Sequence, residues 1–273
     1  MGGAYSATSA ATSMLAFDDR ELDIADDGTF EFTYVAEPGA KTMIVREVFN
    51  DWDTEERGTI TIERPDLLGT AARPLSERTL AKKYEVAARS LVGSIQTWFA
   101  FPQFFQYKEP VNTLTPPQST PGGLASQRSS IGHYSLSPDE AMILTVPRCD
   151  DCSYQGIQIG SDWYASTDYE THQTSLTKAQ AVSDDDGKIR VVVSEQNPGI
   201  ANWLETTGHT TGSMMLRWQR LTRDLGPEDG PVAEVMPLAD VPTRVPHFTP
   251  LTTEEYAERI AARQRSVARR MIS

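Results

Sequence analysis

The sequence predicts a mainly β protein, and three observations lead to that prediction. Short segments in which apolar and polar residues alternate recur in both halves of the chain, and each is bounded by Gly, Pro, Asn or Asp. Helical periodicity is confined to one segment in the first half and one near the end. The 273 residues are 39% hydrophobic and 23% charged, which is ordinary globular composition, so most of the chain can bury a core.

The first part of the chain is expected to hold a flexible end and a set of strands. Residues 1–16 are small and polar without periodicity, which predicts a flexible N-terminus. A chain of this length can form one large β domain or two smaller ones, and we expect a single β domain over 17–245. Within it, the alternation at 30–34 and the apolar segments 43–49 and 59–62 predict a β meander.

A helix is expected to interrupt the β domain at 76–100. After Pro74 the apolar residues fall three or four positions apart, and Ser76 can cap the helix N-terminus. The residues of this apolar stripe are Leu80, Tyr84, Ala88, Leu91, Ile95 and Trp98. The Pro-, Gly- and Ser-rich stretch that follows predicts a long loop over 110–132.

The second half is expected to be antiparallel β, followed by a helix. Further strands are predicted between turn-forming residues, at 141–147, 154–159, 188–194 and 213–221. Thr252 and Glu255 form a capping-box pattern that opens a helix over 256–271, within a C-terminal helical tail at 246–273. Because the apolar stripe of this helix is narrow, we expect the helix to be solvated or to contact a partner.

The charge balance argues against nucleic acid and membrane partners. With 38 acidic and 25 basic side chains the net charge is −13, and such a field repels phosphate backbones and anionic lipids. The arginine-rich end has no interleaved aromatic residues and is interpreted as a helix face. No apolar run is long enough to span a bilayer, and residues 1–15 lack the features of a signal peptide. With only two cysteines present, these observations predict a cytoplasmic location.

Two short motifs are interpreted as structural. Cys149 and Cys152 have the spacing of a dithiol or of half a zinc site, but zinc needs four ligands and the sequence has no second pair. The segment 184–187 lacks the carboxylate pattern of a calcium loop and is typical of a hairpin turn. The common signatures of hydrolases and nucleotide-binding proteins are absent, which lowers the expectation of catalysis without excluding it.

One connection has the composition of a binding site. The segment 197–209 carries amide, carboxylate, indole and imidazole groups, after a Pro-Gly pair that suits a type II turn. The same composition fits a loop that hydrogen-bonds its own backbone while Trp203 fills the edge of a sandwich. His172 lies in a second polar segment, and we expect the two segments to form a concavity at one end of the sandwich.

The candidate ligand-binding residues come from these two segments and from the strands beside them. They are Gln158, His172, Asn197, Asn202, Trp203, Glu205, His209 and Arg217. His172, Glu205 and His209 could also supply three metal ligands, but an isolated histidine is more often a hydrogen-bonded loop residue. No metal ligand and no catalytic residue is therefore assigned, and the cofactor is unknown.

Several short runs of the sequence resemble those of a known family. They include Cys152-Ser153-Tyr154, His172-Gln173-Thr174-Ser175-Leu176, Asn197-Pro198-Gly199, Asn202-Trp203-Leu204, Gly208-His209 and Leu216-Arg217-Trp218. Over roughly residues 18 to 240, the chain resembles the bacterial domain of unknown function 1214, in its longer actinobacterial form. The resemblance implies an antiparallel, jelly-roll-like β-sandwich with a helical insertion, and it implies no substrate, cofactor or catalytic residue.

The chain also departs from the family pattern. Gln155 stands where a large aromatic residue is usual, Lys178 where Gly or a polar residue is common, and Glu205 where Asp is usual. The longer relatives have a helical segment and strands upstream of the position that matches Ala16. The resemblance therefore implies a shortened form with an open sheet edge near its first strand, which invites self-association into a homo-oligomer.

Three functional hypotheses follow. The favoured one is a β-sandwich that binds a small polar or sugar-like ligand without catalysis. The alternative is a hydrolase-like enzyme, with or without a metal, that uses His172, Glu205 and His209. A structural or assembly module is the third, and it gains weight if the segments 170–175 and 197–209 lie far apart.

Overall fold

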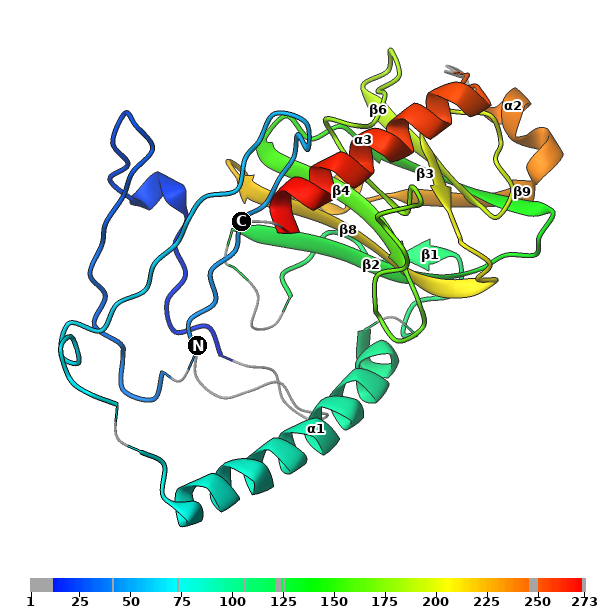
Figure 1. The fold of residues 1–273 in the computed structure, drawn as a ribbon. Helices are drawn as coiled ribbons and strands as arrows, with labels where there is room; N and C mark the ends of the chain where they lie inside the picture. Colours follow the sequence, from blue (N-terminus) through cyan, green and yellow to red (C-terminus); the bar gives the residue numbers. More distant parts are fainter. Residues whose placement is uncertain are drawn as a thin grey trace.

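The computed structural model describes residues 12–40, 42–72, 74–105, 107–120, 124, 126–245 and 250–271. Two β-sheets form the body of the protein in a sandwich-like arrangement, and a C-terminal helix lies against them (Figure 1). The prediction of a mainly β fold with a C-terminal helix is thereby confirmed. None of the helices in the described parts combines the length and the apolar composition needed to cross a bilayer.

The larger sheet has five strands in the order β1-β2-β8-β4-β5. Its strands are β1 (Thr113–Leu114), β2 (Gln127–Ser135), β8 (Thr211–Leu221), β4 (Cys152–Gly160) and β5 (Ser175–Thr177). All of its neighbouring strands pair in the antiparallel direction. The long strands β2, β8 and β4 lie at its centre, so its ends are formed by the short strands β1 and β5.

The smaller sheet has four strands in the order β7-β6-β3-β9. Its strands are β7 (Trp203–Glu205), β6 (Lys188–Ser194), β3 (Glu140–Pro147) and β9 (Val232–Pro237). The pair β6–β7 is parallel, which is an exception to the antiparallel character expected of the second half. A parallel neighbour requires the chain to cross back over the sheet, and the connection 195–202 does so by burying Ile200 on its way.

The main core lies between the two sheets. Alternate residues of each long strand point into it, including Leu144 from β3, Val193 from β6, and Met214 and Trp218 from β8. Each of these side chains is almost completely buried. Burying one such side chain stabilises the fold by about 1.5–3 kcal/mol, so these strands hold the two sheets together.

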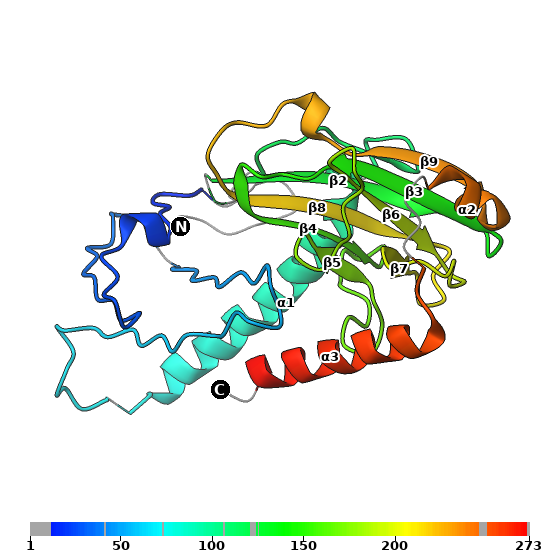
Figure 2. The same cartoon turned by 90° about the horizontal axis from the view of Figure 1, so that it is seen from above.

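A second apolar cluster covers the outer face of the smaller sheet. Ile143 of β3 and Val192 of β6 belong to it, as do Ile200 and Val241. The short helix α2 (Val241–Arg244) and the beginning of α3 (Thr253–Met271) lie over this face (Figure 2). Both faces of the smaller sheet are therefore buried, which explains the nearly continuous apolar sequence of β3 and β6.

The predicted β meander between residues 26 and 62 is wrong. The described residues there contain no strand, and η1 (Asp19–Glu21) is a single 3-10 turn just before them. An isolated bridge joins Ile24 to Phe30. Phe30 and Phe32 remain 44% and 43% exposed, because no neighbouring strand offers them a ladder or an apolar surface. Of the predicted flexible N-terminus, residues 1–11 lie outside the described residues.

The predicted helix is present as α1 (Glu77–Phe105), but it does not interrupt the β domain, because the described residues before it contain no strand. Ser76 caps it as expected, since the Thr79 amide donates to the Ser76 hydroxyl at 3.2 Å. Figure 1 shows α1 extending away from the sheets, with its C-terminal end nearest to them. Its apolar stripe is largely exposed, and near its end the Phe101 ring packs against the Tyr164 ring at a centroid distance of 4.7 Å.

The remaining elements follow the predictions in part. The four strands predicted in the second half are present as β3, β4, β6 and β8, and the Thr252–Glu255 capping box opens α3. The predicted loop 110–132 is wrong in part, because it contains β1 and the start of β2. The strands β5, β7 and β9 were not predicted, nor were the single turns η2 (Pro227–Asp229) and η3 (Leu238–Asp240).

Candidate functional site

The C-terminal helix α3 is held against the sandwich by a buried arginine. The Arg263 guanidinium is only 6% exposed, and it donates to the carbonyl oxygens of Tyr169 and Ser175, the latter at 2.9 Å. Burial lowers the pKa of Arg263 to about 10. Because no carboxylate lies within 4 Å of it among the described residues, its charge is balanced by carbonyl dipoles and by an aromatic ring.

That aromatic ring belongs to Trp52, in the segment before α1. The guanidinium carbons of Arg263 and Arg270 lie 4.5 and 4.2 Å from the Trp52 ring centroid. The Ser266 hydroxyl also donates to the Trp52 carbonyl oxygen at 2.7 Å. Cation–π contacts of this kind contribute about 0.5–2 kcal/mol each. The expectation of a solvated α3 is therefore wrong, because one side of the helix is buried between the sandwich and Trp52.

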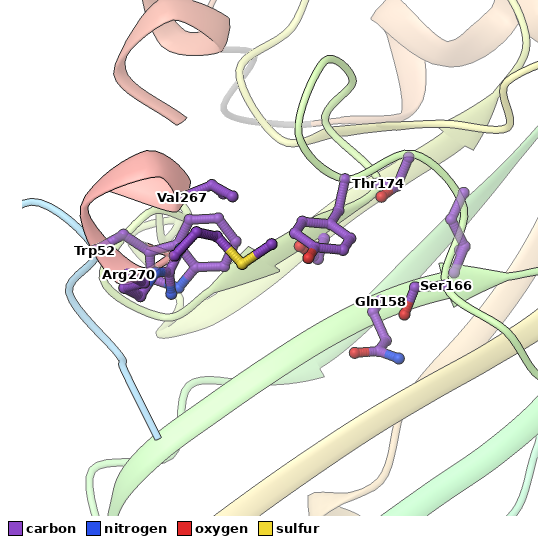
Figure 3. A pocket seen from close by; sticks show the side chains of 10 residues that line it. Trp52, Gln158, Ser166, Thr174, Val267 and Arg270 are labelled. Carbon is purple, nitrogen blue, oxygen red and sulfur yellow. The ribbon is translucent and has the colours of Figure 1, made fainter. Parts of the chain in front are cut away.

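A cavity of about 330 Å³ lies under the C-terminal half of α3. Figure 3 shows Trp52 and Arg270 together on one side of it, and Gln158 and Ser166 on another. Its lining residues are Trp52, Gln158, Ile159, Ser166, Tyr169, Thr174, Ser175, Val267, Arg270 and Met271. An apolar wall with a few convergent polar groups is typical of a small-molecule site.

His172 lies under the N-terminal half of α3, between two carboxylates. Its Nε2 is 3.7 Å from Glu205 Oε1, and its Nδ1 is 3.5 Å from Asp168 Oδ2. Tyr256 of α3 completes the group by donating its hydroxyl to Glu205 Oε2 at 2.9 Å. The Thr171 hydroxyl holds the pKa of Asp168 down to about 2, whereas burial raises the pKa of Tyr256.

The two polar segments predicted to form a concavity do lie together. The Gln173 side-chain amide donates to the carbonyl oxygens of Ala201 and Trp203, and the Glu205 amide donates to the Gln173 carbonyl oxygen at 3.0 Å. These bonds join the segments 170–175 and 197–209 directly. The condition that would have favoured a purely structural module is therefore not met.

Three of the predicted binding residues have structural roles instead. Trp203, expected to be an apolar platform, is 4% exposed and donates its indole N–H to the Ser194 carbonyl oxygen. The Asn202 side-chain oxygen accepts from the Val182 amide, and its side-chain nitrogen donates to the Val182 carbonyl oxygen. Asn197 accepts from the Gly199 amide within the turn, where Gly199 has a φ of 75° as a type II turn requires.

The other predicted residues lie in different places. Gln158 lines the cavity, and His172 and Glu205 form the group beneath Tyr256. His209 is exposed, and its backbone amide donates to Thr206. In the described parts of the chain, no three His, Cys, Asp or Glu side chains are placed to hold a metal ion. Arg217 is on the outer face of the larger sheet, in β8 opposite Gly156 of β4, and it does not line the cavity.

The two cysteines are buried in the main core, as the structural interpretation of their motif requires. The Cys152 thiol donates to the Cys149 carbonyl oxygen at 3.3 Å, and Lys178 Nζ donates to both cysteine carbonyl oxygens. Gln155 bonds the Cys149 amide at 2.8 Å. A hydrogen bond from the Cys152 thiol lowers the pKa of Cys149, and the same pairing raises that of Cys152. Gln155 and Lys178, two positions at which the chain departs from the family that it resembles, therefore stabilise the connection between β3 and β4.

The sequence reasoning missed most of the cavity wall. Trp52 lies between two segments of the predicted β meander, Tyr169 in a segment expected to be a polar connection, and Arg270 on a helix face expected to be solvated. One signal was available in the sequence. The end of α3 combines Val267 and Met271 with several arginines, and an arginine can bury its stem while its guanidinium stacks on an aromatic ring.

The fold has a counterpart among solved structures. No family model matches the chain, and no curated protein matches it. An uncharacterized protein from Burkholderia cenocepacia is 29% identical, with a TM-score of 0.69 over 82% of this chain and 64% of that one. A protein from Vibrio parahaemolyticus is 12% identical, with a TM-score of 0.33 over 42% of this chain and 32% of that one, which is too weak to indicate a shared fold.

Proposed function

We propose that the protein binds a small polar, sugar-like ligand in the cavity under α3, without a catalytic step. The observation that carries the proposal is the cavity itself, whose volume of about 330 Å³ falls at the lower end of the range of small-molecule sites. A compact ligand of monosaccharide size is compatible with such a volume. Four separate segments contribute to the wall, so a bound ligand would also stabilise their arrangement.

The chemistry of the wall supports a ligand rich in hydroxyl groups. Gln158 offers both a donor and an acceptor, and the hydroxyls of Ser166 and Ser175 can do the same. Arg270 adds donors that can also hold an acidic group. The side chains of Val267 and Met271 supply apolar surface for the C–H face of a sugar ring, since the Trp52 ring is already contacted by two guanidinium groups.

The test is a binding titration of the full chain with a panel of monosaccharides, disaccharides and sugar acids. Tryptophan fluorescence is the signal measured during the titration. We expect at least one of them to change the emission of Trp52 and to bind with a defined stoichiometry. Arg270→Gln and Gln158→Leu should weaken that binding about tenfold each, as expected for the loss of a hydrogen bond to a bound ligand.

Two residues of α3 provide matched controls. Arg265→Gln changes the same charge outside the cavity wall, and Gln264→Leu changes an exposed amide on the same helix. Both should bind like the wild type. If no member of the panel binds, or if the control variants lose binding as strongly as Arg270→Gln, the proposal is wrong.

A hydrolase-like enzyme is the second candidate, and one observation favours it. His172 lies between Asp168 and Glu205, and carboxylates on an imidazole are common in acid–base sites. We rank it lower because both ring nitrogens already face a carboxylate, and because the nearby Thr171 hydroxyl is bonded to Asp168. His209, which this hypothesis also requires, makes no contact with the group in the described interactions.

Three broader proposals accompany the binding function. We propose that the chain is related to the bacterial domain of unknown function 1214 and shares its jelly-roll-like topology. We further propose a cytoplasmic location and self-association through open strand edges. The acidic composition supports the proposed cytoplasmic location, since it suits a protein that does not associate with nucleic acid or anionic membranes.

A further inference from the structure

The outer face of the larger sheet is polar and yet buried. Gln127 and Ser129 of β2 and Ser213 and Gln219 of β8 are each less than 9% exposed on this face. Buried polar side chains cost free energy unless they are hydrogen-bonded, and all four of these are bonded. The Gln219 side-chain amide donates to Gln127, Gln127 donates to Ser129, and the Ser213 hydroxyl donates to the Ser161 carbonyl oxygen. Arg217 of β8 is the cation of this face, and it is half-buried between Ser129 and Gly156 on the neighbouring strands.

Arg217 has no acidic partner in the described parts of the chain. The sequence contains 38 acidic side chains, and most of the arginines in the sandwich pair with one of them, whereas no carboxylate lies within 4 Å of Arg217. Its Nε is buried without a hydrogen-bond partner, and its Nη2 lies 3.0 Å from the Met215 sulfur. A thioether is a weak acceptor, so the charge of this guanidinium is poorly compensated.

Two tyrosine hydroxyls lie beside Arg217. Tyr164 donates to the same Met215 sulfur at 3.6 Å. A Cβ atom placed on Gly156 would lie 2.2 Å from the Tyr154 hydroxyl oxygen, so this hydroxyl lies directly over the strand position next to Arg217. Burial raises the pKa of both phenols, and the positive charge of Arg217 opposes the rise. Donors are therefore gathered here around a weak acceptor.

The position of Tyr164 is maintained against strain. Its φ of 59° lies in the left-handed region, which is unfavourable for a bulky side chain. The Tyr164 amide donates to the Ser161 carbonyl oxygen at 2.9 Å, and the rings of Trp98 and Phe101 in α1 pack against the phenol. Strained residues that the surroundings hold in place are concentrated at functional sites.

We propose that Arg217, with the hydroxyls of Tyr154 and Tyr164, binds the oxyanion group of a small molecule, a carboxylate or a phosphate, on the outer face of the larger sheet. The oxyanion supplies the strong acceptor that this group of donors lacks. A planar guanidinium can hold either group through two parallel hydrogen bonds. This site does not depend on the cavity under α3, since no residue of that cavity is part of it.

The test uses the arginine Nε–H signals in the proton–nitrogen NMR spectrum of the full chain. Succinate and inorganic phosphate are titrated in separate arms, at an ionic strength kept constant with sodium chloride. We expect the Arg217 signal to shift and saturate in at least one arm, and the tighter arm identifies the source of the oxyanion. Arg217→Gln should weaken binding about tenfold or more, whereas Arg89→Gln, at an exposed ion pair of α1, should not.

Two smaller changes keep the proposal testable if Arg217→Gln does not fold. Tyr154→Phe and Tyr164→Phe each remove one hydroxyl, and each should weaken binding several-fold while leaving the far-UV spectrum unchanged. If neither anion moves the Arg217 signal up to tens of millimolar, the proposal is overturned. It is also overturned if the anions bind equally well to both tyrosine variants and to the wild type.

Discussion

The sandwich and the N-terminal region differ in what their apolar residues contact. In the sandwich, every long strand buries alternate side chains in a shared core. In residues 12–105, Thr97 and Pro102 alone are buried among the side chains that the structure describes. Both regions have apolar residues at the spacing of a strand or a helix. The comparison shows that such spacing produces a buried element only where a second element covers its apolar face.

The segments 30–34 and 189–193 illustrate this difference. Val191 and Val193 pair with β3 on one side of their strand, and their side chains enter the main core. Phe30 and Phe32 alternate just as regularly, but Phe32 packs against the single ring of Phe17 among the described aromatic residues, at a centroid distance of 5.1 Å. A strand needs ladder partners for its amides and carbonyls, and alternation does not supply them.

The largest expected effect comes from a matched pair of leucine substitutions. Leu144 is 0% exposed in the main core, and Leu91 is 64% exposed on α1. Leu144→Ala should lower the free energy of unfolding by about 2–5 kcal/mol, because it leaves a cavity. Leu91→Ala should change it by no more than about 0.5 kcal/mol. Urea unfolding followed by circular dichroism measures both, and equal effects would show that α1 is covered in solution.

A second pair of variants tests how firmly α3 is attached. Arg263→Ala leaves the carbonyl oxygens of Tyr169 and Ser175 without their donor, so we expect a loss of about 1–3 kcal/mol. Arg265→Ala, on the exposed side of the same helix, should cost less than about 0.5 kcal/mol. The emission of Trp52 should also shift to longer wavelength in Arg263→Ala only. Unchanged emission would mean that Arg263 does not cover the Trp52 ring.

The smallest effect concerns the acid limb of the pH profile. The pKa of Asp168 is about 2 in the folded protein against an ordinary value of 3.8, with the Thr171 hydroxyl as the main cause. Because the pKa of Asp168 is lower in the folded state, its ionised carboxylate stabilises the protein above about pH 3.8. This contribution is lost as the pH falls toward 2. Because Asp168 is half exposed, the change in stability is small, and the pKa itself is the quantity to measure.

Thr171→Val provides the comparison for that measurement. It removes the hydroxyl and keeps the shape of the side chain, so the pKa of Asp168 should rise toward 3.8. Carbon NMR of the carboxyl group during an acid titration reports it directly. A pKa near 2 in the variant would show that the backbone amides of Glu170 and Thr171, which also donate to Asp168, are sufficient.

Elements whose signals are local could be predicted from the amino-acid sequence. The capping box at Thr252 and Glu255, the cap at Ser76 and the turn at Pro198-Gly199 depend on bonds between residues a few positions apart, and all three are present. The buried strands β3 and β6 were equally clear, because a sheet covered on both faces needs continuous apolar sequence. The mainly β fold class follows from these local signals.

Which residues form the candidate sites depends on contacts between distant parts of the chain. Trp203 looks like a ligand platform in the sequence but is covered by α3, whereas Trp52 becomes a cavity wall only because Arg263 and Arg270 reach it from the other end of the chain. Contacts at such separation leave no local pattern. The polar strand β2 was predicted to begin as a loop for a related reason. Its serines lie beside the partner strand β8, and the composition of β2 alone does not reveal that pairing.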